Sequence, residues 1–186
     1  MTRWIVVDAQ AVGAPLVTTV AFAVAMGAAA AIDLKSRRIP NALTISALVA
    51  GLVLRVPLGF EAVGVGILGA GLGLLLSGPF FLAGALGGGD VKLIVAVGAF
   101  MGPAQLIGAC LLIALIGGVV AVLDAARRGA LRTALMNVVL LVVGWLSRGR
   151  SPPPPTLDSP SAMTIPYGVP IAMGALAWWF WGGNLV

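Results

Sequence analysis

The chain has 186 residues, of which 60% are hydrophobic and only 9% are charged, and its formal net charge is +5. Soluble domains carry roughly 25% charged residues, and the apolar runs here are too long and too numerous for barrel strands. The composition therefore predicts an all-α integral membrane protein, and the basic residues in its short loops indicate membrane orientation and not nucleic-acid binding.

Apolar runs predict about six transmembrane helices along the chain. Asp8 and Pro15 interrupt the stretch that follows Arg3, so no cleavable signal peptide is expected. The first span ends at Asp33, the third is rich in glycine and should pack closely against a neighbour, and Gly102-Pro103 divides a later run into two spans. In chain order the predicted spans cover residues 15–32, 42–58 and 62–83, two spans within 91–123, and about 165–181.

The apolar segment 134–146 is too short for an ordinary span, so we expect an interfacial or re-entrant helix there. We expect one polytopic domain over residues 1–186, with a cytoplasmic loop and a Pro-rich linker at about 124–165. This arrangement leaves Arg3 and Arg55 outside. It places nine basic residues inside, as the positive-inside rule favours: Lys35, Arg37, Arg38, Lys92, Arg127, Arg128, Arg132, Arg148 and Arg150.

A glycine-rich stretch, Gly87-Gly88-Gly89-Asp90-Val91-Lys92, stands at the edge of the apolar runs. An ionised aspartate at membrane depth is costly and marks a functional site by default. We expect the glycines to permit unusual backbone angles and to let an extended substrate peptide approach Asp90. The alternative is a glycine-rich turn in which Asp90 caps the next helix.

Asp33 and Asp90 are both predicted at the inner ends of spans, so they share one membrane face. Two close carboxyl groups share a proton, and one can activate a water while the other protonates a scissile carbonyl. This chemistry suits a chain with no histidine and a single cysteine, for which we expect no metal or other cofactor. Two alternatives stay open: Lys35 and Lys92 pair with the aspartates, or the aspartates couple ions in a small transporter.

Three stretches together resemble the type IV prepilin peptidases, a family of membrane aspartic proteases that also includes the archaeal preflagellin peptidases. Residues 33–41 resemble the segment around the family's first aspartate. Residues 87–93 resemble its GxGD segment, and residues 165–170 resemble the opening of its last span. The resemblance implies that Asp33 and Asp90 are catalytic. It also implies that six further residues bind substrate or shape the site: Gly87, Gly89, Lys92, Pro166, Tyr167 and Gly168.

The resemblance further implies cleavage of the basic leader of a prepilin-like protein, just before its hydrophobic helix, at the cytoplasmic face of the inner membrane. The expected partners are that substrate and membrane lipids, and no oligomeric state is predicted. Larger family members carry a cysteine-rich zinc region and N-methylate their product. The first basic loop here is short and lacks cysteine. The chain thus resembles the short peptidase-only members that serve Flp/Tad-type pili, while a catalytically inactive pilus assembly factor is a further alternative.

Overall fold

The computed structural model describes residues 16–146 and 167–182, and all of its regular structure there is helical. No strand occurs among these residues, so the prediction of an all-α protein is confirmed. The elements are α1 (Leu16–Ser36), α2 (Asn41–Val53), the short 3-10 helix η1 (Val56–Leu58), α3 (Phe60–Leu82), α4 (Gly88–Met101), α5 (Pro103–Arg127), α6 (Leu131–Leu146) and α7 (Gly168–Trp181).

Four of the described segments are long and apolar enough to cross a membrane, which identifies the chain as a membrane protein. They are α1, the segment Asn41–Leu58 formed by α2 and η1, α3 and α5. The helices α4 and α7 have 14 residues each, or about 21 Å at 1.5 Å per residue, against a hydrocarbon core of about 30 Å. The predicted count of six spans therefore stays a prediction.

The predicted ends of two spans were wrong. The helix α1 does not end at Asp33 but continues to Ser36, and Arg37, with φ of 50°, terminates it. The helix α5 likewise continues through Asp124 to Arg127. Asp124 forms an ion pair of 2.8 Å with Arg128, one turn further on, and such i,i+4 pairs stabilise a helix. Charged residues at these positions end the apolar runs without ending the helices.

The break at Gly102-Pro103 is confirmed, because Gly102 has φ of 81° and separates α4 from α5. The predicted close packing of the glycine-rich span is confirmed in part. A β-carbon at Gly69 would overlap the backbone of Gly98 in α4, and one at Gly73 would lie 3.0 Å from the carbonyl oxygen of Ile94. Gly71 instead faces open space. Small residues thus let α3 and α4 approach closely along one face of α3.

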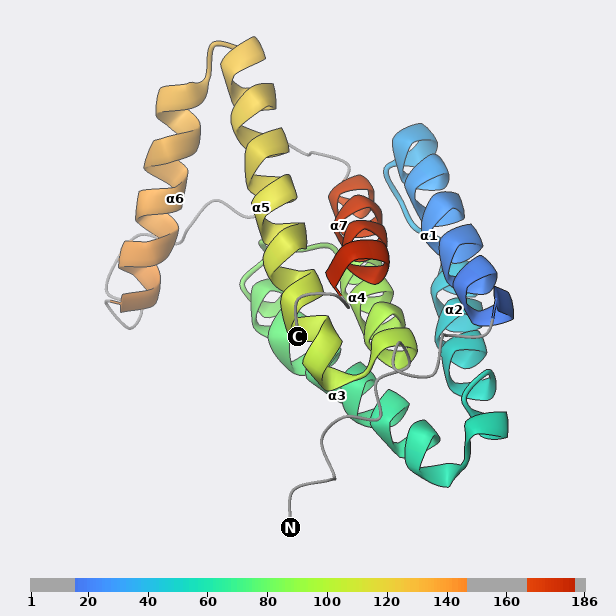
Figure 1. Ribbon diagram of the computed structural model, residues 1–186. Coiled ribbons are helices and arrows are strands. Elements are labelled where there is room, and N and C mark those ends of the chain that lie inside the picture. Colours follow the sequence, from blue (N-terminus) through green and yellow to red (C-terminus); the bar gives the residue numbers. More distant parts are fainter. Residues whose placement is uncertain (1–15, 147–166, 183–186) are drawn as a thin grey trace.

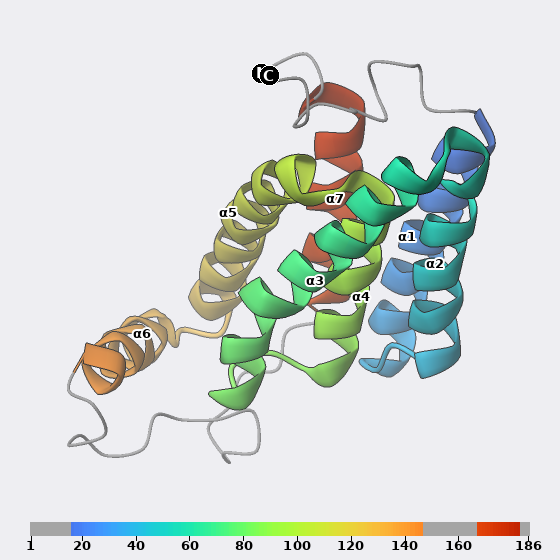
Figure 2. The ribbon, with the colours of Figure 1, turned by 90° about the horizontal axis from the view of Figure 1, so that it is seen from below.

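The helix α4 forms the centre of the bundle and packs against α1, α2, α3, α5 and α7. Most of its side chains are buried, including Leu93, Val97 and Phe100. The C-terminal ends of α1 and α5 and the N-terminal end of α7 lie at the same end of the bundle (Figure 1). The view from below shows α3 passing across α4, and α6 lying beyond the C-terminal end of α5 (Figure 2). The helix α7 packs against α1, α4 and α5, and its residues Met173, Phe180 and Trp181 are exposed.

Arg55 was counted as a loop charge facing the outside, but its side chain is only 3% exposed. Its Nε donates to the carbonyl oxygen of Ala99 at 2.9 Å and its Nη2 donates to that of Phe100 at 2.7 Å. Its Nη1 donates to the carbonyl oxygen of Ala62 at 3.2 Å. The guanidinium therefore satisfies carbonyls in the last turn of α4, where a cation is favoured, and joins that turn to the start of α3.

We expect Arg55→Met to lower the free energy of unfolding by about 1–3 kcal/mol, because buried carbonyl oxygens lose their donors. The measurement is thermal unfolding of the detergent-solubilised protein. Arg132→Met, at an exposed position of α6, is the matched control and should unfold as the wild type does. An Arg55→Met variant that is as stable as the control would show that the buried guanidinium makes no net contribution to the free energy of unfolding.

Candidate active site

Asp33 lies in the last turn of α1, and it is buried at 4% exposure. Its Oδ2 accepts a hydrogen bond of 2.8 Å from the backbone N–H of Gly168, the first residue of α7. A β-carbon at Gly168 would lie 2.9 Å from that oxygen and 3.0 Å from Ile39 Cδ1. Gly168 therefore lets the backbone of α7 approach the carboxyl group and fix its position.

Asp90 lies in the first turn of α4 and is half-buried. Gly87 is the N-cap residue of this helix and has no side chain of its own to cap it. The Asp90 carboxyl group turns back and accepts a hydrogen bond from the backbone of Gly87, where a β-carbon would lie 2.9 Å from Asp90 Oδ2. This contact is the one that the capping alternative expects. The first turn of a helix favours a negative charge at this place.

The two aspartates, 57 residues apart in the sequence, come close enough for their charges to interact. Tyr167, immediately before α7, lies within electrostatic reach of Asp90. Its ring packs on α5 at Gly117, where a β-carbon would lie 2.7 Å from the phenol oxygen and 3.0 Å from Cζ. The ends of α1, α4 and α7 thus gather two carboxyl groups, a phenol and a backbone N–H at one place.

Neither predicted lysine partner pairs with an aspartate among the described residues. Lys92 is exposed, and its amine donates to Asn41 Oδ1 at 2.7 Å, which links α4 to the start of α2. Lys35 is also exposed, and the cation that acts on Asp33 is the nearby Arg37. The ion-pair alternative through the two lysines is therefore wrong.

The three motif glycines do not adopt unusual backbone angles, contrary to expectation. Gly87 has φ of −74° and ψ of 149°, and positive φ values occur at other glycines of the described chain. The motif glycines instead leave space for neighbouring residues to pack closely. A β-carbon at Gly89 would lie 3.2 Å from Ile39 Cβ, whereas one at Gly88 would meet the ring of Phe81 at an ordinary 3.4 Å. Gly89 lets the loop after α1 pack onto the start of α4.

Sequence reasoning missed two residues of this site. Ile39 is buried in an otherwise polar and charged part of the loop and lies against both Gly89 and Gly168. An apolar residue within a basic loop was the available signal. Gly117, which seats the Tyr167 ring, carried no signal, because its helix contains several similar glycines. Pro166, a predicted site residue, lies outside the described residues.

The described residues contain no group of three or more side chains of the kinds that hold a metal ion. What they bring together is a pair of carboxyl groups with a phenol nearby, a set able to hold a water and to transfer protons.

Comparison with known proteins gives one finding. Residues 20–122, more than half of the chain, match the model of the type IV leader peptidase family. The matched part contains both Asp33 and Asp90, while Tyr167 and Gly168 lie beyond it. No curated protein and no solved structure matches the chain significantly.

Proposed function

The chain belongs to the type IV leader peptidase family, and on that premise we propose that it is an aspartic endopeptidase that uses Asp33 and Asp90 to remove the leader peptide of a prepilin-type protein. Family membership makes it a peptidase and implies a prepilin-type substrate in general. It also favours hydrolysis over the alternative of ion-coupled transport. The aspartic mechanism, the residues and the side of cleavage are our proposals.

One observation supports this proposal: Asp33, which is bound by the N–H of Gly168 at the start of α7, and Asp90, in the first turn of α4, lie close enough for their charges to interact. Such a pair shares one proton and titrates as a unit. The ionised carboxyl group takes a proton from a water, whose oxygen attacks the scissile carbonyl carbon. The protonated carboxyl group gives its proton to the carbonyl oxygen. The resulting tetrahedral intermediate collapses as the peptide nitrogen receives a proton and leaves.

The lengths of α4 and α7 support a water-accessible site. Each is about 21 Å long, roughly 9 Å shorter than the hydrocarbon core. If their far ends lie level with those of their longer neighbours, their first turns lie below the membrane surface. Non-helical backbone at that depth is tolerated where it lines a water-filled recess. We place this recess at the cytoplasmic face of the inner membrane, because the basic segment 34–41, at the end of α1 and the start of α2, belongs to the same end.

The substrate class follows from the same reasoning. A leader that is basic stays in the cytoplasm, while the hydrophobic helix that follows it enters the bilayer, so the scissile bond lies at the boundary where the aspartates stand. We propose a Flp-like prepilin of the Flp/Tad type as substrate. We propose no N-methylation, because the loop between Asp33 and Asn41 has no room for a cysteine-rich zinc region.

The direct test uses a prepilin-type reporter that consists of a basic leader, an apolar helix of about 20 residues and a C-terminal tag. Coexpression with the wild-type chain should convert most of the reporter to a shorter tagged product on a gel. Sequencing the new N-terminus should place the cut just before the apolar helix. A reporter that keeps its full length in the presence of correctly inserted protein would refute the proposal.

The proposed topology predicts that α6 does not cross the membrane. Its 16 residues and the basic residues around it favour a cytoplasmic interface. In a Cys110→Ala background, Ser147→Cys and Ser159→Cys should not react with an impermeant thiol reagent in intact cells, but should react after permeabilisation. Labelling of either position from outside would contradict the six-span topology.

A further inference from the structure

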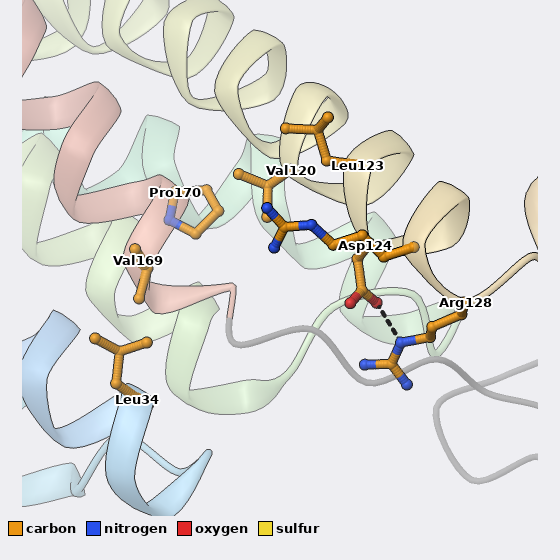
Figure 3. A pocket seen from close by; sticks show the side chains of 8 residues that line it. Leu34, Val120, Leu123, Asp124, Arg128, Val169 and Pro170 are labelled. Carbon is orange, nitrogen blue, oxygen red and sulfur yellow. Dashed lines mark ion pairs between the residues drawn. The ribbon is translucent and has the colours of Figure 1, made fainter.

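The first turn of α7, which carries Gly168, borders a cavity of about 280 Å³ between the C-terminal ends of α1 and α5 (Figure 3). Its apolar lining comes from three helices: Leu34 of α1, Val120 and Leu123 of α5, and Val169 and Pro170 of α7. Side chains that line a cavity lack packing partners on that side. Close packing therefore does not hold this turn from the side of the cavity, and contacts further along α7 must help to fix the Gly168 N–H against Asp33.

Trp178 attaches the far end of α7 to α5. Its Nε1 donates a hydrogen bond of 2.8 Å to Oε1 of Gln105, which is 7% exposed. Its ring lies on Gly108, about one turn further along α5, where a β-carbon would overlap the ring atoms. A partly buried Trp N–H needs an acceptor, and the ring needs the space that a side chain at Gly108 would fill. The two contacts together therefore specify one position of α7 along α5.

Two further contacts interlock the same two helices. At Gly174 of α7, a β-carbon would lie 2.7 Å from the backbone nitrogen of Ile113 in α5. At Gly117 of α5, the missing side chain leaves space for the Tyr167 ring. Along this interface a bulky residue of one helix thus meets a glycine of the other three times. A shift of α7 by a single residue, about 1.5 Å along its axis, would separate each bulky residue from its glycine.

Trp179 attaches the same end of α7 to α1, the helix that carries Asp33. Its ring stacks on Phe22 with the ring centroids 4.7 Å apart, and its Nε1 lies 3.4 Å from Thr19 Oγ1. The helix α7 is therefore bound to α1 at two places, through Trp179 and through the Gly168 N–H. About 15 Å of continuous helix separates them, so a displacement of the tryptophan end along the helix axis also displaces Gly168.

Building on the proposed function, we propose that Trp178, Gln105 and Gly108 are positioning residues for catalysis. They set the position of α7 along α5 and so hold the Gly168 N–H at the Asp33 carboxyl group. They act through α7 and not on the substrate. Because a misplacement of about 1 Å can cost roughly a hundredfold in rate, contacts at the far end of α7 determine how fast the aspartates work.

The first test fills the space under the Trp178 ring. Gly108→Ala should lower kcat for the prepilin-type reporter by roughly ten- to a hundredfold. KM should change little, because an interaction needed only in the transition state is lost. Trp178→Phe in the Gly108→Ala background makes the ring smaller and should restore most of kcat. Gly118→Ala is the matched control, because a β-carbon at Gly118 has no neighbour within 4 Å.

The second test determines whether the effect passes through Gly168. Gly168→Ala places a β-carbon 2.9 Å from Asp33 Oδ2 and should lower kcat directly. Gln105→Leu removes the acceptor of the Trp178 N–H and should lower kcat by roughly fivefold or more. If Gln105 acts through the contact between Gly168 and Asp33, the double variant should be at most about twofold slower than Gly168→Ala, since changes that act on one contact do not add. A purely structural role would add its full loss.

The results separate the positioning role from the proposed function. Three outcomes overturn the positioning role while the wild type still cleaves: normal kcat in Gly108→Ala, parallel loss of kcat and melting temperature without rescue by Trp178→Phe, or full additivity of Gln105→Leu with Gly168→Ala. If Gly108→Ala does not fold, Gln105→Leu, which leaves Gly108 free for the ring, decides alone. A wild-type chain that does not cut the reporter refutes the proposed function, and the positioning role falls with it.

Discussion

Asp33→Asn and Asp90→Asn are each expected to abolish reporter processing while the variants still insert into the membrane. General acid–base catalysis contributes roughly 10²–10⁴ to a rate, and a proton-sharing pair fails when either member cannot ionise. The ratio of precursor to mature reporter on a gel is the measurement. Glu61→Gln is the matched control, because Glu61 is an exposed acid in the first turn of α3, the turn that Arg55 joins to the far end of α4.

The Asp33→Asn variant also distinguishes a loss of catalysis from a loss of stability. Its side-chain oxygen can still accept the N–H of Gly168, which now binds Asp33 Oδ2 at 2.8 Å. Thermal stability of Asp33→Asn should therefore stay near that of the wild type, whereas Asp33→Ala should lose stability because a buried donor is left unsatisfied. Full processing by either Asn variant, at matched expression, would remove that aspartate from the proposed mechanism.

Much of the fold could be predicted because the signals were local. Long apolar runs predicted the helices, and Gly102-Pro103 predicted the break between α4 and α5. The helix ends were less predictable, since the first span was expected to end at Asp33 and Asp124 was expected in a loop, although both lie inside helices. A charge inside a helix is tolerated when a neighbour on the next turn or another backbone binds it, and sequence alone does not show that partner.

The candidate site was predictable in its chemistry and not in its packing. Asp33 and Asp90 stood out because few acids adjoin apolar runs, and the predicted topology put both at one membrane face. The packing depends on how helices far apart in the sequence are aligned. It includes the hydrogen bond from Gly168 to Asp33, the contacts of Ile39 with Gly89 and Gly168, and the contact of the Tyr167 ring with Gly117. The role of Arg55 was hidden for the same reason, because its partners Ala99 and Phe100 lie 44 and 45 residues away.

Gly89→Leu should also stop processing, with a much smaller effect on stability. A β-carbon at Gly89 would already lie 3.2 Å from Ile39 Cβ, so a larger side chain must push the loop after α1 away. Ile39 also lies against Gly168, which holds Asp33. The displacement therefore reaches both carboxyl groups, and a shift of about 1 Å can cost roughly a hundredfold in rate.

The neighbouring glycines provide graded controls for this prediction. Gly88→Ala should process well, because its β-carbon meets the Phe81 ring at an ordinary 3.4 Å. Gly87→Ala should lie between the two, since its β-carbon would stand 2.9 Å from Asp90 Oδ2 and would turn the carboxyl group without moving the backbone. Each variant is scored for reporter cleavage and for thermal stability in detergent.

The comparison of the two readouts decides what the glycines do. If the motif glycines keep the two carboxyl groups in their catalytic positions, cleavage should fall steeply from Gly88→Ala through Gly87→Ala to Gly89→Leu. The melting temperature should then change little. If the glycines serve only to pack α4 against the loop, cleavage and melting temperature should fall together. Normal cleavage by Gly89→Leu would show that the contact with Ile39 has no bearing on the aspartates. The loop after α1 would then be free to move without disturbing the site.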